Sequence, residues 1–290
     1  MKIAILHICT GKYEIFWKDF FVSCEKHFII ETEKEYFVFT DSPHIEYEDA
    51  EKIGRRIHRI PQANLGWPDN TLLRYEMFLK IKDQLVAKDQ TSKFDYVFFF
   101  NANAVFKNDI SAKEFLPNND TSQAGHSDQG SQGSQGGQEK LVGCLHPGYY
   151  NKPVKKFTYE KNPMSKAFLA EKDRHFYFAG GINGGDTRTF IEVAEELATD
   201  IREDHKSGLT AIWHDESHWN RYLNENINIV KKISPAYMFP EGSSLPFEPK
   251  IVIMDKNRLG GHGKMRNRLE LRLLVNKLKE SLKSLMQIRS

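Results

Sequence analysis

The sequence has few cysteines and no long apolar run. Its 290 residues include three cysteines, Cys9, Cys24 and Cys144, with no CxxC pair and no zinc-finger spacing. An odd number of widely spaced cysteines does not form a disulfide framework, so we expect free, buried thiols and a reducing compartment. The apolar start "MKIAILHIC" is far shorter than the roughly 20 residues that span a bilayer, and no cleavage site follows it. We therefore expect a cytoplasmic protein.

A strong overall charge and the common phosphate-binding motifs are also absent. The formal net charge is +2, which says little about partners. No Walker A sequence occurs, and the glycines of "GGINGG" (180–185) do not fall at the GxGxxG positions of dinucleotide-binding folds. Gly180 and Gly181 would let a ligand approach the backbone closely, although the hexapeptide alone favours a tight turn before a helix.

Strand-like and helix-like segments alternate along the chain. Apolar, β-branched and aromatic runs predict strands near residues 2–9, 35–41, 56–60, 94–100, 227–239 and 249–255. Helical periodicity predicts helices within 12–28 and 71–88 and after Asp186 or Thr187. This alternation is typical of an α/β fold in which helices cover a mostly parallel sheet.

The stretch "FFFNANAVF" (98–106) places two small amides directly after the most apolar strand. In open α/β sheets, ligands bind at the carboxyl ends of the strands, where Asn101 and Asn103 would lie. Nucleotide-sugar enzymes often carry two aspartates at such a position to hold a divalent metal. The neutral amides therefore raise the question of whether the chemistry is lost or only the metal.

The segment "AIWHDESHWN" (211–220) contains two adjacent carboxylates, Asp215 and Glu216, between two tryptophans. Carboxylates beside aromatic rings suit sugar chemistry, because a ring covers an apolar sugar face and an acid stabilises an oxocarbenium-like charge. The alternative is a helix start at which Asp and Glu are favoured by the helix dipole. His214 and His218, four residues apart, would share a helix face, but no third metal ligand is evident.

Two segments differ from the rest in composition. Residues 118–140 are rich in Ser, Gln and Gly and hold no large apolar residue, which predicts a disordered surface loop inside the domain. Residues 256–290 contain ten Lys and Arg and two Glu. Leucines recur along one face of this basic tail, so residues 258–290 are expected to include an amphipathic helix. It would pack on the domain or on a second subunit, or contact a membrane surface peripherally; we expect no nucleic acid partner.

Eight stretches together resemble the retaining glycosyltransferases of family 6, which include the histo-blood-group A and B transferases and the α-1,3-galactosyltransferases. They cover most of residues 2–257 and comprise "KYEIFWKDFFVSCEKHF", "YFVFTDSP", "WPDNTLLR", "HPGYYNKP", "FTYEKNPMSKAF", "FYFAGGINGG", "AIWHDESHWNRYL" and "SPAYMFPEG". The resemblance implies a GT-A fold over residues 1–257, in which a Rossmann-like nucleotide-binding half with a mixed, mostly parallel sheet is joined to an acceptor-binding half. The implied reaction transfers galactose or N-acetylgalactosamine (GalNAc) from its UDP donor to a galactoside 3-hydroxyl with retained α configuration.

The resemblance also implies roles for individual residues. The uracil and ribose positions fall on Ile8, Cys9, Thr10 and Tyr13. Other donor contacts fall on Arg74, which Trp67 precedes in the family pattern, and on Asn101, Ala102, Asn103 and Asp215. Positions that shape sugar and acceptor specificity fall on His146, Gly148, Ala179, Gly180 and Gly181. The acceptor-stacking tryptophan is Trp213, and the catalytic carboxylate facing the reacting carbon is Glu216, which is also placed at the acceptor. Glu216 would be a covalent nucleophile or would stabilise the cation during same-face attack.

The chain departs from the family at the metal motif, where Asn-Ala-Asn replaces the two aspartates, as in a bacterial-type, metal-independent member. Amide oxygens are weaker ligands for Mn²⁺ or Mg²⁺ than carboxylates, so we expect no metal and no cofactor. Lys256 aligns with a phosphate-contacting lysine of the family, and Lys264 and Arg266 are further candidates. Residues 179–181 leave room beside C2 of the sugar, which favours UDP-GalNAc over UDP-galactose. The acceptor would be a galactoside, fucosylated or plain, and the rival interpretation is a catalytically inactive sugar- or UDP-binding protein.

Overall fold

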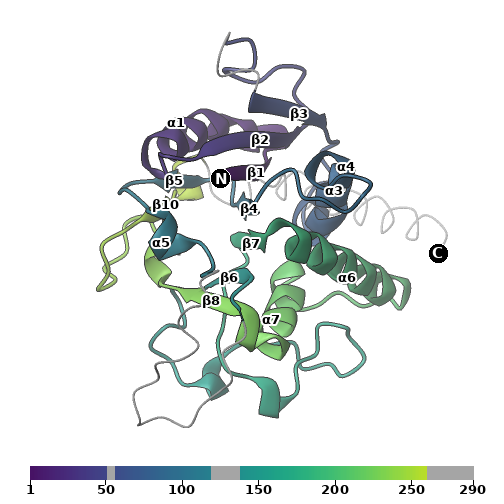
Figure 1. Cartoon of the computed structure of the whole chain (residues 1–290). Helices are drawn as coiled ribbons and strands as arrows, with labels where there is room; N and C mark the ends of the chain where they lie inside the picture. The colour runs from purple at the N-terminus through teal and green to yellow at the C-terminus, as the bar shows by residue number, and fades with distance from the viewer. Residues whose placement is uncertain (51–55, 119–137, 260–290) are drawn as a thin grey trace, which may run out of the picture.

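A central sheet with helices on both faces organises the protein (Figure 1). The computed structural model describes residues 1–50, 56–118 and 138–259. Its strands are β1 (Lys2–Ile8), β2 (Glu33–Thr40), β3 (Ile57–Pro61), β4 (Tyr96–Phe100), β5 (Ala104–Phe106), β6 (Leu141–Cys144), β7 (Ile182–Asp186), β8 (Val230–Ile233), β9 (Phe239–Pro240) and β10 (Ile251–Ile253). Its α-helices are α1 (Trp17–His27), α2 (Asp69–Leu72), α3 (Arg74–Leu79), α4 (Lys82–Leu85), α5 (Ala112–Phe115), α6 (Thr187–Lys206) and α7 (Asp215–Glu225).

Seven strands form the main sheet in the order β3-β2-β1-β4-β7-β6-β8. Neighbouring strands run parallel, except that β7 is antiparallel to both β4 and β6. The expected mixed, mostly parallel sheet of a GT-A-like glycosyltransferase fold is therefore confirmed. Strands β1, β4 and β6 consequently point the same way, and the segments that follow them meet at one edge of the sheet.

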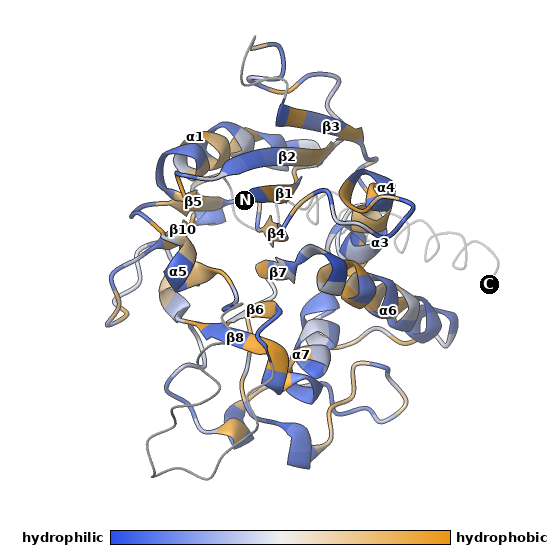
Figure 2. Cartoon of the chain, viewed as in Figure 1, coloured by the Kyte–Doolittle hydropathy of each residue, from blue (hydrophilic) through white to orange (hydrophobic). Residues whose placement is uncertain are grey.

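Both faces of this sheet are buried, which explains the unbroken apolar run of β4. Phe98 and Phe100 pack with Phe20 and Phe28 on the face covered by α1. Val97 and Phe99 belong to a second core cluster on the opposite face, with residues of α3 and α6. Because successive side chains of a strand point to opposite faces, a strand buried on both faces is apolar throughout. Figure 2 shows the corresponding pattern on α6, where hydrophobic and hydrophilic residues recur along the same helix.

Gly180 and Gly181 lie in the expected turn, but a strand follows it, and Gly184 and Gly185 have a different role. Residues 182–186 form β7, paired antiparallel with β4. A Cβ at Gly184 would lie 2.3 Å from the carbonyl oxygen of Val97, and a Cβ at Gly185 would lie 2.1 Å from that of Lys140. These two glycines therefore allow a close approach of neighbouring strands. Asp186 then caps α6 by accepting a hydrogen bond from the backbone N–H of Thr189, as expected.

The helix predicted within 71–88 is broken into three short pieces. Leu73 and Ile81 take backbone angles outside the helical region, with ψ of 18° and 14°. The apolar periodicity continues through both breaks, which is why the sequence predicts one helix. The first break places Arg74 at the start of α3, directly beside the segment 64–71. At the other predicted helix, residues 11–16 form a 3-10 helix before α1 begins.

A second, smaller sheet brings the end of the described chain back to the central strand. Strand β10 pairs antiparallel with β5, which follows Asn103 almost directly, and also pairs with β9. The backbone N–H of Met254 donates to the carbonyl oxygen of Asn103 over 2.9 Å. This pairing carries Lys256 to the edge of the main sheet where β1 and β4 end.

Several expectations concern the remainder of the chain. Most of the predicted loop 118–140 and of the basic tail 258–290, with Lys264 and Arg266, lies outside the described residues. In the described part, no helix combines the length and the apolar character needed to cross a membrane. The three cysteines are buried and unpaired, and burial raises the pKa of both Cys9 and Cys24 to about 12. The compartment and the membrane contact stay predictions.

Candidate active site

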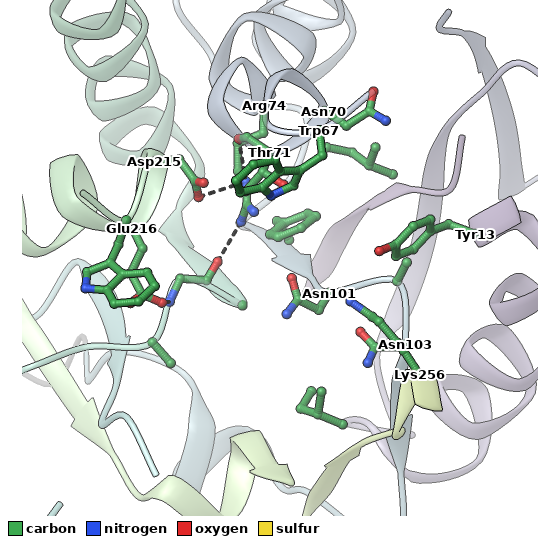
Figure 3. A pocket seen from close by; sticks show the side chains of 18 of the residues that line it. Tyr13, Trp67, Asn70, Thr71, Arg74, Asn101, Asn103, Asp215, Glu216 and Lys256 are labelled. Atoms are coloured by element: carbon green, nitrogen blue, oxygen red, sulfur yellow. Dashed lines mark hydrogen bonds and ion pairs between the residues drawn. The ribbon is translucent and has the colours of Figure 1, made fainter. Parts of the chain in front are cut away.

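A cleft of about 850 Å³ opens at the edge of the sheet where β1, β4 and β6 end (Figure 3). Thr10, Asn101 and His146, which follow these three strands, line it together with residues from α3, α7 and the C-terminal segment. Of the residues predicted for the site, the cleft is lined by Ile8, Thr10, Tyr13, Trp67, Arg74, Asn101, Ala102, Asn103, His146, Ala179, Gly180, Gly181, Trp213, Asp215, Glu216 and Lys256. The fold thus brings together side chains from distant segments of the chain. Before the structure, only the family resemblance assigned them to one site.

Figure 3 shows two walls of this cleft. The carboxylate wall consists of Arg74, Asp215 and Glu216, and the amide wall consists of Tyr13, Asn101, Asn103 and Lys256. In the described residues that line the cleft, Asp215 and Glu216 are the two that carry carboxylates. The chain therefore separates its anionic groups from its amides and its lysine across one cavity.

Glu216 is held in place by two hydrogen-bond donors. The backbone N–H of Gly180 donates to Oε2 over 2.8 Å, and the hydroxyl of Tyr177 donates to Oε1 over 3.1 Å. Burial raises the pKa of this carboxyl, while the two donors and Arg74 act in the opposite direction. Glu216 also lies in the first turn of α7, where the helix dipole favours a negative charge. The helix-start interpretation and the sugar-chemistry interpretation of this segment are therefore compatible.

Asp215 is buried, with 1% of its surface exposed, and it has an unusual hydrogen-bonding state. Oδ2 lies 3.0 Å from Nε of Arg74, but the Nε–H group is directed to the carbonyl oxygen of Thr71 over 3.3 Å. Neither carboxylate oxygen of Asp215 accepts a hydrogen bond. The pKa of Asp215 is raised to about 7, chiefly by burial; Arg74 lowers it and the nearby Glu216 raises it. Buried acceptors in this state are normally satisfied by a partner, which at a cleft wall is a ligand.

Arg74 is a buried structural cation as well as a cleft residue. It is 5% exposed, and its Nη1 donates to the carbonyl oxygen of Gly180 over 2.6 Å. Its guanidinium group lies 4.5 Å from the centre of the Phe99 ring. These contacts fix Arg74 between the strand β4 and Asp215. The predicted contact between Arg74 and the donor remains a prediction, because most of its donors already serve the protein.

The amide wall is built by the return of the C-terminal segment. The side-chain amide of Asn103 donates to the carbonyl oxygen of Met254 over 2.8 Å, and the backbone N–H of Asn101 donates to the carbonyl oxygen of Gly181 over 2.8 Å. The ammonium group of Lys256 lies 4.9 Å from the centre of the Tyr13 ring. This wall therefore offers amides and a cation where the family pattern has two aspartates.

A divalent metal fits this donor set poorly. Asn101 and Asn103 supply neutral amide oxygens, and Asn103 is 3% exposed, with its amide nitrogen bound to Met254. Mg²⁺ and Mn²⁺ prefer carboxylate oxygens and water. Within the described ranges, the side chains close enough to share a metal are His44, Glu48 and Asp49, and these do not line the cleft. His214 and His218, considered as a metal pair, are separated, since His214 contacts Trp67 and His218 lies 3.6 Å from Asp204.

Gly148 and Cys9, both predicted for the site, do not line the cleft. The backbone N–H of Gly148 donates to Nδ1 of His146 over 3.0 Å. This bond places the proton of the neutral imidazole on Nε2. Burial lowers the pKa of His146 to about 4, so the ring stays neutral at pH 7. Gly148 therefore orients His146, and its role at the acceptor stays a prediction.

Cys9 is the other predicted site residue that does not line the cleft, and its contact with the nucleotide stays a prediction. Its side chain is fully buried in the core with Trp17 and Phe20. Its backbone N–H donates to the carbonyl oxygen of Phe39, and its own carbonyl oxygen accepts from the hydroxyl of Thr40. Since strand side chains alternate, the residue after Ile8 is directed to the core, and a motif alignment does not reveal that.

Gly180 and Gly181 are required by contacts within the protein as well as by the cavity. A Cβ at Gly180 would lie 2.9 Å from Cβ of Glu216, so glycine lets the backbone come close enough to donate to Glu216. A Cβ at Gly181 would lie 2.3 Å from Cε of Met238. Met238 lines the cleft and was not singled out from the sequence, because no local pattern marks it.

Other cleft residues were also missed. The segment 64–71 contributes Asn64, Leu65, Gly66, Asn70 and Thr71, and further lining residues are Phe99, Pro147, Met238, Pro240 and Ile253. Gly66 has φ of +75°, a left-handed conformation that signals a turn at this position. Tyr177 lies behind the wall and reaches Glu216 across 39 residues of sequence, a contact with no local signal.

Comparisons with known proteins agree with the geometry. A model of glycosyltransferase family 6 matches residues 129–259. The O-antigen biosynthesis glycosyltransferase WbnI of Escherichia coli is 34% identical over 266 residues, which is 92% of this chain and 100% of that protein. Globoside alpha-1,3-N-acetylgalactosaminyltransferase 1 of Homo sapiens is 27% identical over 199 residues, 68% of this chain and 49% of that protein. Histo-blood group ABO system transferase 1 of Rattus norvegicus is 38% identical over 101 residues, 35% of this chain and 29% of that protein. A relative matched over its whole length, together with the family model, shows that this chain belongs to glycosyltransferase family 6 and is a glycosyltransferase.

Proposed function

We propose that the chain transfers GalNAc from UDP-GalNAc to the 3-hydroxyl of a galactoside, in α linkage with retained configuration and without a divalent metal. The observation that carries this proposal is the division of the cleft into a carboxylate wall and an amide wall. The name of a human relative, an alpha-1,3-N-acetylgalactosaminyltransferase, supports the choice of sugar and linkage. A retaining transfer needs an anion near the anomeric carbon and a neutralised diphosphate, and the two walls suit these two needs.

Glu216 faces the anomeric carbon in this proposal. It acts as the nucleophile of a covalent intermediate or as the anion that stabilises the cationic transition state during same-face attack. Both roles need the ionised carboxylate, and the donors from Gly180 and Tyr177 stabilise that form. Trapping of a glycosyl-enzyme by mass spectrometry distinguishes the two.

Asp215 binds the donor sugar. Its two oxygens are buried and accept no hydrogen bond from the protein, so sugar hydroxyl groups can donate to them. Its charge beside Glu216 also favours positive charge at the reacting carbon. Burial raises the pKa of Asp215, and hydrogen bonds from the hydroxyl groups of the donor would favour its ionised form.

The amide wall receives the diphosphate of UDP. Asn101 and Asn103 bring no negative charge that would repel it, and Lys256 supplies a positive charge that stabilises the leaving group. The ammonium group of Lys256 lies 4.9 Å from the centre of the Tyr13 ring. In this proposal, Tyr13 contacts the uridine. The amide and lysine groups would thus replace the metal bridge expected from the two-aspartate motif.

The donor sugar and acceptor are assigned from the remaining cleft residues. Ala179, Gly180 and Gly181 together place one methyl group on their part of the wall, which leaves room for the acetamido group of GalNAc. Trp213 is 46% exposed at the cleft and presents a ring on which a galactoside can stack. His146, neutral and protonated on Nε2, can donate a hydrogen bond to the same acceptor.

The test is product formation with UDP-GalNAc and with UDP-galactose, each with excess EDTA and with added Mn²⁺. A plain and a fucosylated galactoside serve as acceptors, and the linkage is read by NMR. We expect transfer of GalNAc that EDTA leaves unchanged. Activity that collapses in EDTA and returns with Mn²⁺ would show that the amide wall does not replace the metal, and faster transfer from UDP-galactose would reassign the donor.

A further inference from the structure

A chain of hydrogen bonds lies behind the carboxylate wall and ends at Glu216. The indole N–H of Trp213 donates to Oγ1 of Thr158 over 2.7 Å, and the hydroxyl of Tyr149 lies 2.8 Å from the same oxygen. The hydroxyl of Thr158 reaches that of Tyr177 over 3.5 Å, and Tyr177 donates to Glu216 over 3.1 Å. Residues from four separate segments thus connect the exposed indole of Trp213 to the carboxylate.

The chemistry of these groups fixes the direction of the chain. A carboxylate accepts only, so the proton of Tyr177 points to Glu216, and its oxygen is left to accept from Thr158. Thr158 then accepts from both Trp213 and Tyr149. Burial and the charge of Glu216 raise the pKa of Tyr177, so its hydroxyl keeps its proton and stays a donor. Every bond in the chain therefore donates toward Glu216.

The ring of Tyr177 has little freedom to move. It is 2% exposed, and its centre lies 4.5 Å from the ring of Tyr149, 5.4 Å from that of Tyr159 and 5.7 Å from that of His146. Such close packing restricts rotation of the ring and sets the position of the hydroxyl. On the other side, the backbone of Gly180 fixes Oε2 of Glu216, so the two donors together determine the orientation of the carboxylate.

We propose that Tyr177 is a positioning residue that holds Glu216 in its reactive orientation, and that Thr158 joins it to Trp213. The inference rests on the proposed function of Glu216 at the anomeric carbon. Loss of the Tyr177 hydroxyl leaves Oε1 without a donor, which destabilises the ionised form and frees the carboxylate to rotate. Through Thr158, the indole that stacks on the acceptor and the carboxylate that serves the donor share one hydrogen-bonded unit.

The test compares Tyr177→Phe with Tyr159→Phe in the full chain. Both variants remove one hydroxyl from the same aromatic cluster, but the hydroxyl of Tyr159 donates to the carbonyl oxygen of Phe176 over 2.7 Å and does not reach Glu216. We expect Tyr177→Phe to lower kcat about tenfold to a hundredfold, the range for a hydrogen bond to a charged group, with little change in the KM of the donor. The acid limb of its pH–kcat profile should move to higher pH.

Tyr159→Phe should keep kcat within about twofold and leave the pH profile unchanged. The hydrogen bond it removes joins two neutral groups and does not reach Glu216, so it contributes little to the reaction. A Tyr177→Phe enzyme with native kcat and a native pH profile overturns the proposal. Equal losses in the two variants, with no movement of the acid limb, also overturn it, because they indicate a packing effect.

Substitutions at Thr158 provide an independent test of the proposal. Thr158→Val removes the hydroxyl and should reduce kcat less than Tyr177→Phe, while Thr158→Ser should restore it. Carbon-13 NMR of labelled glutamate carboxyls, with Glu216 assigned from Glu216→Gln, reads the pKa of Glu216 in native and Tyr177→Phe protein without any turnover. An unchanged Glu216 pKa refutes the positioning bond. If the pKa of Glu216 rises in Tyr177→Phe but the native protein transfers no sugar, the bond between Tyr177 and Glu216 is supported and the proposed function is refuted.

Discussion

The two walls of the cleft differ in how the chain holds their polar groups. On the carboxylate wall, Glu216 accepts from Gly180 and Tyr177, and Arg74 is locked between Gly180 and Phe99. On the amide wall, the uncharged Asn103 and the cation Lys256 are positioned by a segment that returns from the end of the described chain. The carboxylate wall holds buried charged groups in fixed positions, and the amide wall carries no negative charge.

In the function that we propose, sugar transfer and diphosphate binding depend on different walls. Glu216 keeps its two supporting donors, while the other wall carries Asn101, Asn103 and Lys256. Burial raises the pKa of both Asp215 and Glu216, because it disfavours their charged forms. Acids with such raised pKa values in a cleft are typical of a functional site.

The largest expected effect comes from removing the charge of Glu216. Glu216→Gln preserves the shape of the side chain but cannot stabilise positive charge at the anomeric carbon. We expect kcat to fall about a hundredfold to a thousandfold, with donor binding retained. Product assays and calorimetry with UDP-GalNAc measure the two quantities. Glu225→Gln, at the far end of the same helix and paired with Arg221, should be close to native; equal activity of the two variants would remove Glu216 from the reaction.

The frame of the carboxylate wall can be broken at Arg74. Arg74→Met leaves the carbonyl oxygen of Gly180 without its donor and Asp215 without its cation. We expect a loss of about 2–3 kcal/mol in the free energy of unfolding, measured with urea. The matched control is Arg202→Met, because Arg202 is 50% exposed and pairs with Glu76 at 3.5 Å, a surface contact worth less than about 1 kcal/mol. Similar losses in both variants would contradict a supporting role for Arg74.

The amide wall can be weakened at Lys256. Lys256→Met removes the positive charge proposed to face the diphosphate. We expect the KM for UDP-GalNAc to rise about tenfold, the value of one charge-assisted hydrogen bond, and the effect to shrink in high salt. Lys107→Met, an exposed lysine that does not line the cleft, should leave the KM unchanged. If the KM of Lys256→Met is native, residues other than Lys256 contact the phosphates.

The pH dependence of stability reports on the carboxylate wall without any substrate. Burial raises the pKa of Asp215 from 3.8 to about 7 in the folded chain. Between these values the folded chain holds a proton that the unfolded chain has lost, so this carboxyl contributes stability that declines as the pH rises from about 4 to about 7. Asp215→Asn should therefore gain stability relative to the native chain over that window, measured by urea unfolding. Parallel stability curves for the native chain and Asp215→Asn would contradict the raised pKa of Asp215.

Features that depend on local interactions were predicted from the sequence, and features that depend on contacts between distant segments were not. The strand 96–100 and the helix from Thr187 were predicted correctly, because apolar patterns and the Asp186 cap are local signals. The breaks at Leu73 and Ile81 were missed, since the apolar periodicity runs through them. Strand β7 was missed too, because its glycines serve a close approach of backbones that only the paired strands reveal.

The site shows the same division. Motif residues such as Asp215, Glu216 and Trp213 were identified from their types and order in the sequence, and the fold brings them to one cleft. The orientations were not predictable in this way. Cys9 is directed to the core, Gly148 orients His146, and Tyr177 supports Glu216 from behind the wall.

The sequence by itself determined the α/β alternation and the family, because these depend on residue types and on local periodicity. Tertiary structure alone decided that Asp215 is buried beside Arg74, that Arg74 serves Gly180, and that the C-terminal segment places Lys256 beside Tyr13. Each of these features depends on a contact between segments far apart in the chain. Burial and the competition for hydrogen-bond donors exist only once those segments have packed together.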